Sequence, residues 1–430
     1  MSERQDWLRN MKNKTFLVWS IFLFLCCLAG CSSTKTPERN EELARNTEIA
    51  SEQIPGTESQ EEATEGFPSS EKTEEEILQE KVTEYLNKMT LEEKAAQLFI
   101  VLPEALVEGV SSVTAAGTAT QEAIDRIPVG GFIYMENNLQ SSQQVTSMLE
   151  NVQKFSRERI GLPMFLCVDE EGGSVARIGG TGKFDVPAAL SMAEIGQRKN
   201  ADEAYGIGET IGGYLSDLGF NVDFAPVADV WTNPKNQVVK KRAFGSDADV
   251  VSYMANAAAE GLMSQEILPC FKHFPGHGNT TADTHAGYAY TSKTKEELYE
   301  CELIPFLEGI KNDVPFIMVG HISLPNVTGD DTPASLSSVI MQDLLREEMG
   351  YEGIIITDAF NMGAIANQYS SGEAAVKALQ AGADILLMPK DFQSAYEEVV
   401  LAMKDGRLPM ERIDESLKRI LTKKIEIDSR

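Results

Sequence analysis

Three of the four histidines in the chain lie in one short stretch, from Phe271 to His285. An imidazole titrates near neutral pH and serves mainly in proton transfer or metal binding, so a cluster of His273, His277 and His285 is not surface filler. Asp283 lies two residues before His285, and a carboxylate beside an imidazole fixes its tautomer and keeps it basic enough to move protons. The stretch therefore predicts proton-transfer chemistry on a loop. Two other interpretations stay open: a loop of polar turn-forming residues, or a metal-binding histidine cluster.

Other chemically capable residues follow apolar runs that have the length and composition of buried strands. A lone aspartate in such a place is as often a helix cap as a catalyst, and Asp358 in ITDAFNM allows that interpretation. Several clusters are hard to explain by caps, and a barrel brings the carboxyl ends of its strands together at the active site. Carboxylates mixed with Lys and Arg suit a polyhydroxylated ligand, because hydroxyls both donate and accept. The residues placed in this way are Asp169, Glu170, Glu171, Arg177, Asp223, Asp229, Arg242, Lys272, His273, His321 and Asp358.

The apolar runs alternate with helical patterns, which indicates an α/β fold. Eight runs over about 350 residues predict a single (β/α)₈ TIM barrel. An open, doubly wound sheet is the alternative, since the number of strands does not show closure. No glycine-rich phosphate fingerprint follows the first run, which disfavours the dinucleotide-binding version of that sheet. The predicted strands are 97–102, 129–134, 163–168, 222–226, 269–271, 315–319, 353–357 and 383–388, and the helices between them are 141–160, 201–218, 250–265, 295–311, 339–349 and 372–381.

Two further helices flank this pattern. An amphipathic helix is expected over residues 74–89, and a closing one over 410–427. Thr90 followed by Glu93 has the spacing of a capping box, which predicts that another helix opens at that point.

Motifs of several other enzyme classes are absent from the sequence. There is no HExxH zinc motif, no GxSxG elbow and no P-loop. What remains is a carboxylate directed at the barrel axis and a proton donor on a loop, which fits acetal cleavage without a metal or cofactor. Asp358 would attack the anomeric carbon, and the loop imidazole would protonate the leaving oxygen. Most glycosidases pair two carboxyl groups, so a His–Asp pair would here replace the acid.

Residues 1–31 have the pattern of a lipoprotein signal peptide. Lys12 and Lys14 precede an apolar run, 16–28, that is short for a membrane span, and small residues then lead to Cys31. The sequence LAGC resembles the bacterial lipobox, which implies cleavage before Cys31 and lipidation of that cysteine. An uncleaved membrane anchor is the alternative, and Met11 is an alternative start. We therefore expect an extracytoplasmic protein that touches the bacterial cell membrane through its lipid anchor only.

Composition separates a tail from a folded domain. Residues 32–74 are rich in Glu, Ser and Thr with almost no aromatic residues, which predicts a disordered acidic tether before a catalytic domain over 75–430. The net charge of −28 and the pI near 4.6 argue against nucleic acid as a partner. Cys167, Cys270 and Cys301 have no CxxC spacing, so neither a disulfide framework nor a thiolate zinc site is expected.

Several segments together resemble glycoside hydrolase family 3, in its β-N-acetylglucosaminidase branch. KHFPGHG followed by DTH is similar to the hallmark loop of that branch, and VDEEGG, KRAFG, ITDAFNM and AGADILLMP resemble its other segments in the same order, over roughly 86–421. The sequence has Ser174 where relatives often carry Arg, and Thr284 where Ser is commoner. The resemblance implies a nucleophile at Asp358, a general acid/base at His285 oriented by Asp283, and sugar-binding groups at Asp169, Arg177, Arg242, Lys272 and His273.

The sequence thus predicts a retaining exo-β-N-acetylglucosaminidase that removes terminal GlcNAc from peptidoglycan or chitin-type fragments, acting as a monomer. Many β-glucosidase relatives take their acid from a second domain, whereas here the loop would supply it. A β-glucosidase or β-xylosidase of the same family is the first alternative. A non-catalytic solute-binding lipoprotein is the second, because such receptors also combine a lipobox, an acidic tether and an α/β body.

Overall fold

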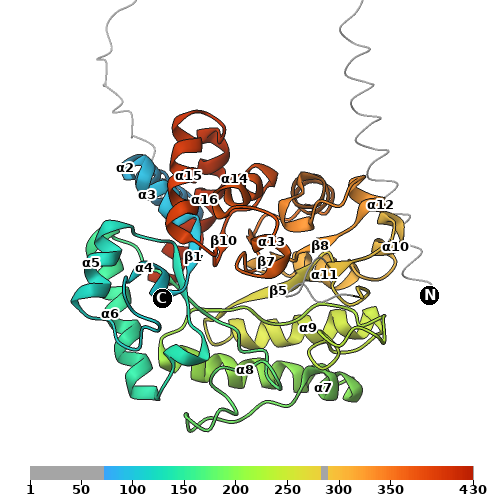
Figure 1. The fold of residues 1–430 in the computed structure, drawn as a ribbon. Helices are drawn as coiled ribbons and strands as arrows, with labels where there is room; N and C mark the ends of the chain where they lie inside the picture. Colours follow the sequence, from blue (N-terminus) through green and yellow to red (C-terminus); the bar gives the residue numbers. More distant parts are fainter. Residues whose placement is uncertain (1–71, 282–288, 430) are drawn as a thin grey trace, which may run out of the picture. The chain divides into compact units, whose positions relative to one another are not determined.

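The structure, a computed structural model, describes residues 72–281 and 289–429 (Figure 1). The predicted signal peptide with Cys31, all but the end of the predicted tether, and the pair Asp283 and His285 lie outside these residues. They remain predictions. None of the helices in the described part of the chain combines the length and hydrophobicity of a membrane-spanning segment.

Eight parallel strands form a nearly closed barrel. Their order around it is β10-β1-β2-β3-β4-β5-β7-β9, and a parallel bridge between Ile356 and Ile385 links β9 to the segment leading into β10. The first and last strands pair directly, with Phe99 opposite Leu386. This arrangement confirms the predicted TIM barrel, and the open doubly wound alternative is wrong. The strands are β1 Phe99–Val101, β2 Gly131–Ile133, β3 Phe165–Val168, β4 Val222–Asp223, β5 Leu268–Phe274, β7 Phe316–Val319, β9 Ile354–Thr357 and β10 Leu386–Leu387.

Helices surround the barrel, and α8 packs against α9 along one side of it (Figure 1). Their apolar faces are buried on the strands, as their sequence period requires. The helices are α2 Glu74–Lys88, α3 Leu91–Gln97, α4 Pro103–Leu106, α5 Thr118–Arg126, η1 Glu136–Asn138, α6 Ser142–Ile160, α7 Met192–Arg198, α8 Ala201–Leu218, α9 Ala248–Met263, α10 Lys295–Tyr299, α11 Ile304–Lys311, α12 Pro325–Thr328, η2 Ala334–Leu336, η3 Val339–Glu348, α13 Gly363–Ala366, α14 Ser371–Ala381, α15 Phe392–Lys404 and α16 Met410–Asp428.

A capping box starts α3 where the sequence predicts one. The Thr90 hydroxyl accepts a hydrogen bond from the Glu93 backbone N–H at 3.2 Å, and the Glu93 carboxylate accepts one from the Thr90 N–H at 2.9 Å. This pair is the predicted capping box, and it satisfies two N–H groups that have no partner inside α3.

Three elements differ from the prediction. The helix expected over 295–311 is broken into α10 and α11, because a helix continuing through Pro305 would press the proline ring against the carbonyl of Cys301. Strand β5 extends to Phe274, so Lys272 and His273 belong to the strand itself, and the Lys272–His273 and Phe274–Pro275 peptide bonds are cis. The helix expected over 339–349 is the π-helix η3.

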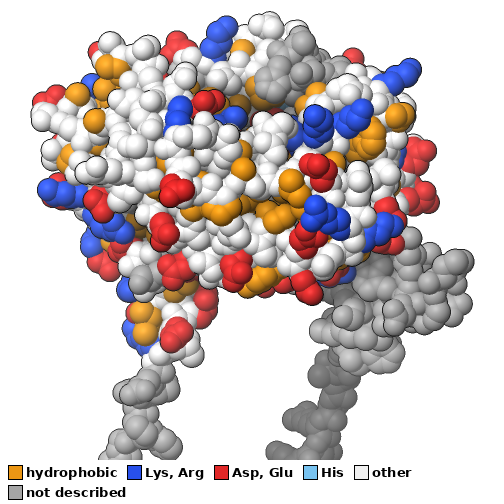
Figure 2. Space-filling model, turned by 90° about the horizontal axis from the view of Figure 1, so that it is seen from below, with side chains coloured by type: hydrophobic (Ala, Val, Ile, Leu, Met, Phe, Trp, Pro, Cys, Tyr) orange, Lys and Arg blue, Asp and Glu red, His pale blue; other side chains and the backbone are white. Residues whose placement is uncertain are grey.

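Aromatic side chains fill much of the core. Phe99, Phe132, Phe165 and Phe316 are fully buried, and the rings of Phe165 and Phe316 meet edge to face at 5.4 Å. On the face shown in Figure 2, positive and negative side chains are interspersed with apolar ones.

A buried aspartate ties the closing elements together. Asp384, just before β10, accepts hydrogen bonds from Arg346 of η3 at 2.8 Å, Ser416 of α16 at 2.6 Å and the Ile355 N–H of β9 at 2.9 Å. Because Asp384 is wholly buried, these partners offset the cost of removing its charge from water. The aspartate thus ties the segment that leads into β10 to η3, to β9 and to the last helix, α16.

Candidate active site

A pocket of about 530 Å³ opens at the carboxyl ends of the strands. Its polar walls come from the segments that follow β3 and β4, from β5 itself, and from the residue after β9. Buried and partly buried methionines and aliphatic residues supply most of the rest of its lining. In a TIM barrel this end of the strands carries the active site. The polar lining residues are Asp169, Glu171, Arg177, Arg242, Lys272, His273, His277, Asp358 and Asn361.

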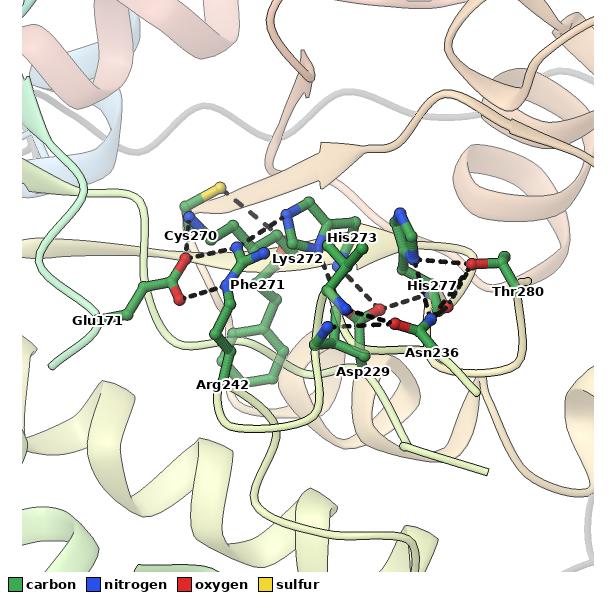
Figure 3. A network of polar contacts seen from close by, with 12 residues as sticks. Glu171, Asp229, Asn236, Arg242, Cys270, Phe271, Lys272, His273, His277 and Thr280 are labelled. Carbon is green, nitrogen blue, oxygen red and sulfur yellow. Dashed lines mark hydrogen bonds and ion pairs between the residues drawn. The ribbon is translucent and has the colours of Figure 1, made fainter. Parts of the chain in front are cut away.

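One wall is a cluster of four charges centred on Glu171, and Figure 3 shows Glu171 beside Arg242 and Lys272. Its carboxylate accepts two hydrogen bonds from the Arg242 guanidinium, from Nε and Nη2, both at 2.7 Å. Lys272 Nζ lies 2.7 Å from Glu171 Oε1 and 2.8 Å from Asp169 Oδ1. Two cations and two anions therefore alternate around the pocket wall, which gives a sugar both donors and acceptors.

The charges in this cluster stabilise one another. Burial alone would raise the pKa of the Glu171 carboxyl, but Arg242 and Lys272 outweigh it and hold that pKa well below its ordinary value. Burial would lower the pKa of the Lys272 ammonium, and Asp169 and Glu171 raise it above the usual range instead. Both groups are therefore ionised near neutral pH, although each is almost wholly buried.

A second wall is organised by Asp229, which follows β4 (Figure 3). Its Oδ2 lies 2.8 Å from His273 Nδ1, and its Oδ1 accepts from the backbone N–H groups of His273 at 3.2 Å and His277 at 2.6 Å. Burial would raise the pKa of Asp229, but the two imidazoles hold it below its usual value. The ionised carboxylate therefore keeps the proton of His273 on Nδ1 and leaves Nε2 facing the Arg242 guanidinium, 3.4 Å away.

The chain turns back on itself directly after this wall. Gly278 packs so closely on the preceding loop that an added Cβ would lie 1.9 Å from the Val230 carbonyl oxygen. A residue with a side chain cannot occupy this position without moving one of the two segments. The contact therefore fixes His277 against the pocket.

Asp358 stands at the end of β9 with its side chain in the pocket. Its Oδ1 accepts a hydrogen bond from the Ala359 N–H at 2.8 Å. Burial would raise the pKa of this carboxyl, but the imidazoles of His321 and His273 and the Ala359 N–H hold it below the ordinary value. An ionised, partly desolvated carboxylate of this kind is the state that a nucleophile requires.

The structure brings six of the predicted site residues together at one pocket: Asp169, Arg177, Arg242, Lys272, His273 and Asp358. The Arg177 side chain lines the pocket with its Nε unpartnered among the described residues. The other predicted site residues, Asp283, His285 and Cys31, lie outside the part of the chain that the structure describes. In the described ranges, no group of three or more His, Cys, Asp or Glu side chains is arranged to hold a metal ion.

Glu171, Asp229 and His277 shape the pocket, although the sequence names them only as candidates and assigns them no role. Their spacing does not show which side chain turns toward the pocket. Glu170 is the counterexample, because its carboxylate accepts from the N–H groups of residues 177–179 and from the Tyr214 hydroxyl instead of facing the pocket. Burial is the largest effect on Glu170 and raises its pKa.

A nearly closed eight-stranded barrel with a charged pocket at the carboxyl ends of its strands has the architecture of a barrel enzyme. The family described as the glycosyl hydrolase family 3 N-terminal domain matches residues 90–423. The chain therefore belongs to glycoside hydrolase family 3, which confirms the resemblance seen in the sequence.

Curated relatives and solved structures agree with this assignment. The chain is 31% identical over 338 residues to β-hexosaminidase A of Pseudoalteromonas piscicida, covering 74% of this chain and 56% of that protein. It is 36% identical over 275 residues to β-hexosaminidase LpqI of Mycobacterium tuberculosis, covering 61% of this chain and 68% of LpqI. The family 3 β-N-acetylglucosaminidase from Paenibacillus sp. FPU-7 superposes with a TM-score of 0.73 at 33% identity, over 79% of this chain and 63% of that one. The chain thus spans little more than half of the Pseudoalteromonas protein.

Proposed function

We propose that this protein is a retaining exo-β-N-acetylglucosaminidase in which Asp358 is the nucleophile. The observation that carries the proposal is the Asp358 carboxylate, buried at the end of β9 and kept ionised in a pocket walled by hydrogen-bonding charges. In a retaining mechanism this carboxylate attacks the anomeric carbon and forms a covalent glycosyl-enzyme, which water then hydrolyses. The charged cluster and His273 hold the hydroxyls of the sugar while this happens.

The acid for the leaving oxygen is assigned to His285, with Asp283 as its orienting carboxylate. Both follow β5 closely in the sequence, after the turn that Gly278 and His277 fix against the pocket. The proposal rests here on the spacing of the two residues, which lets a carboxylate favour the protonated imidazole. The same ring would serve as the base for the attacking water in the second step.

The GlcNAc preference is supported by the relatives, several of which are named β-hexosaminidases, and by the structural neighbour named a β-N-acetylglucosaminidase. A β-glucosidase or β-xylosidase of the same family is the competing activity. Hydrolysis of a panel of p-nitrophenyl glycosides tests the choice, and we expect the N-acetyl-β-glucosaminide to be the best substrate. A β-glucoside or β-xyloside cleaved with a higher kcat/KM would contradict it.

The retaining course has its own test. A 5-fluoro N-acetylglucosaminyl fluoride should label Asp358, as read by peptide mass spectrometry, and the first-formed sugar should have the β configuration by NMR. A label on another carboxylate, or an α-configured first product, would overturn the nucleophile assignment.

We further propose that the protein is lipid-anchored outside the cell membrane through Cys31 and acts there on peptidoglycan or chitin fragments. The motivation is the LAGC sequence at the end of the short apolar run. Cys31→Ser should leave the protein unlipidated, and fractionation of cells should find it released or as an uncleaved precursor. Recovery of the variant in the membrane fraction as a mature lipoprotein would show that the anchor is not this cysteine.

A further inference from the structure

His277 lines the pocket, and one of its two ring nitrogens, Nε2, makes none of the contacts described so far. Its side chain is 2% exposed, and its Nε2 has no hydrogen-bond partner among the residues that the structure describes. A buried polar group without a partner costs free energy, so such a group beside a binding pocket indicates that a ligand completes it. His277 is not among the predicted acid, nucleophile or sugar-binding residues.

Every other polar atom of His277 is already engaged. Its backbone N–H donates to Asp229 at 2.6 Å, and its carbonyl accepts from Asn236 Nδ2 at 2.8 Å and from the Thr280 N–H at 3.1 Å. Its ring Nδ1 lies 2.9 Å from the Thr280 hydroxyl. Figure 3 shows this nitrogen turned toward Thr280 and Asn236 and the other turned away from them. The ring is therefore held in one orientation before any ligand arrives.

These contacts also select the tautomer. The Thr280 hydroxyl lies 2.9 Å from both the His277 carbonyl oxygen and Nδ1. Two N–H donors already occupy the two lone pairs of that carbonyl, so the hydroxyl hydrogen is free to go to Nδ1. Burial lowers the pKa of His277 by more than the nearby Asp229 raises it, which keeps the ring neutral. A neutral ring that accepts at Nδ1 carries its proton on Nε2, and Nε2 then acts as a donor.

The position of His277 indicates which group of the sugar would accept the hydrogen bond from Nε2. His277 lines the same pocket as Asp358, the proposed nucleophile, so it is available to the part of the sugar around the anomeric carbon. Next to the anomeric carbon is C2, whose acetamido group distinguishes the proposed substrate from a glucoside. The acetamide carbonyl is a strong acceptor, and Met318 and Met362, which also line the pocket, offer apolar surface for its methyl group.

We propose that His277 is a specificity residue, whose Nε2–H donates a hydrogen bond to the 2-acetamido carbonyl of the bound sugar. This inference rests on the proposed function, because it assigns a residue to the N-acetyl group of that substrate. Thr280 would be a positioning residue that holds the tautomer of His277.

The test compares p-nitrophenyl N-acetyl-β-glucosaminide with its N-trifluoroacetyl analogue in wild type and variants, so that effects of the larger, electron-withdrawing CF3 group that do not involve His277 are common to both proteins. The trifluoroacetyl carbonyl is the weaker acceptor, so the wild-type protein should prefer the acetyl substrate. His277→Leu should lose about 10- to 100-fold in kcat/KM on the acetyl substrate, the range for leaving one buried hydrogen-bonding group unpaired. It should lose less on the analogue, so the ratio between the two should shrink. The inductive effect of fluorine on the chemistry is the same in both proteins and cancels in this comparison.

Thr280 supplies the matched variants. Thr280→Val removes the hydroxyl with little change in shape and should reduce the substrate ratio, whereas Thr280→Ser keeps the hydroxyl and should restore it. Because these changes leave the His277 ring in place, they test the assignment even where His277→Leu folds poorly.

The outcomes separate the two proposals. A wild-type protein that does not cleave the acetyl substrate overturns the proposed function, and this inference with it. An active wild type whose His277→Leu and Thr280→Val variants keep the same substrate ratio overturns the role of His277 alone.

Discussion

Replacing Glu171 by glutamine tests whether the charged wall of the pocket is held by its buried carboxylate. Three charge-assisted contacts of 2.7 Å meet at this side chain, two from Arg242 and one from Lys272. Glutamine has nearly the same shape but one acceptor oxygen, and its amide hydrogens would face the cations. Lys272 would keep its contact with Asp169, whereas Arg242 would keep at most one of its two hydrogen bonds to this side chain. Removing one partner of a buried ion pair costs about 3–5 kcal/mol, so the free energy of unfolding should fall by that amount near pH 7.

The same carboxylate should give this loss a pH dependence. Its pKa is lowered in the folded state, so its stabilisation is fully present above the unfolded-state pKa of about 4.3 and is lost as the pH falls further. Glutamine cannot titrate. The difference in unfolding free energy between wild type and Glu171→Gln should therefore be constant from about pH 6 to pH 8 and shrink below about pH 4.

Urea unfolding followed by circular dichroism at several pH values measures both effects. Glu158→Gln is the control, because Glu158 and Lys154 form a long, exposed pair of 3.8 Å on α6. An exposed pair of this kind contributes about 0.5 kcal/mol at most. A Glu171→Gln loss as small as that of Glu158→Gln would refute the reasoning, and so would a difference that does not shrink in acid.

Three further expectations follow from the site and the core. Asp358→Ala should abolish turnover while still binding GlcNAc, as read by calorimetry; residual turnover near wild type would exclude it as the nucleophile. His285→Ala should slow substrates with poor leaving groups by about 10²–10⁴-fold and activated aryl glycosides much less, and equal losses on both would exclude an acid role. Burial lowers the pKa of Lys424 to about 7, so the unfolded state binds more protons than the folded one between about pH 7 and pH 10. Wild-type stability relative to Lys424→Met should therefore rise across that window, and a flat or falling difference would contradict the assignment.

The fold was largely predictable because strands that are buried on both faces appear in the sequence as continuous apolar runs. The runs that contain Phe165–Val168 and Ile354–Thr357 are read directly from the sequence, and their alternation with helices predicts a barrel. The break at Pro305 shows the limit of periodicity, since the apolar spacing continues across a residue that a helix interior excludes. Closure of the barrel depends on a pairing between distant strands, which no local pattern encodes.

The sequence indicates which segments form the site, but it does not show which side chain in each segment faces the pocket. Asp169, Glu170 and Glu171 are adjacent in the sequence, yet Glu170 satisfies backbone N–H groups while Glu171 holds the two cations. This choice is made by the backbone path of the turn, which the residue types alone do not determine. Asp229 is a candidate in the sequence, but its role could not be predicted, because its partners His273 and His277 come from the next strand and the loop after it.

The pairing of β1 with β10 has a consequence for how the protein is made. Phe99 and Leu386 are neighbours in space but are separated by most of the chain, so the entropy of closing that loop has to be overcome before the barrel is complete. Until β10 arrives, β1 and β9 both present open edges, and an exposed edge strand is a template for pairing with another molecule. Chains truncated before Leu386 should therefore aggregate instead of accumulating as a shorter barrel. The segment from Leu386 onward carries none of the proposed catalytic residues, yet the rest of the chain needs it to avoid aggregation during synthesis.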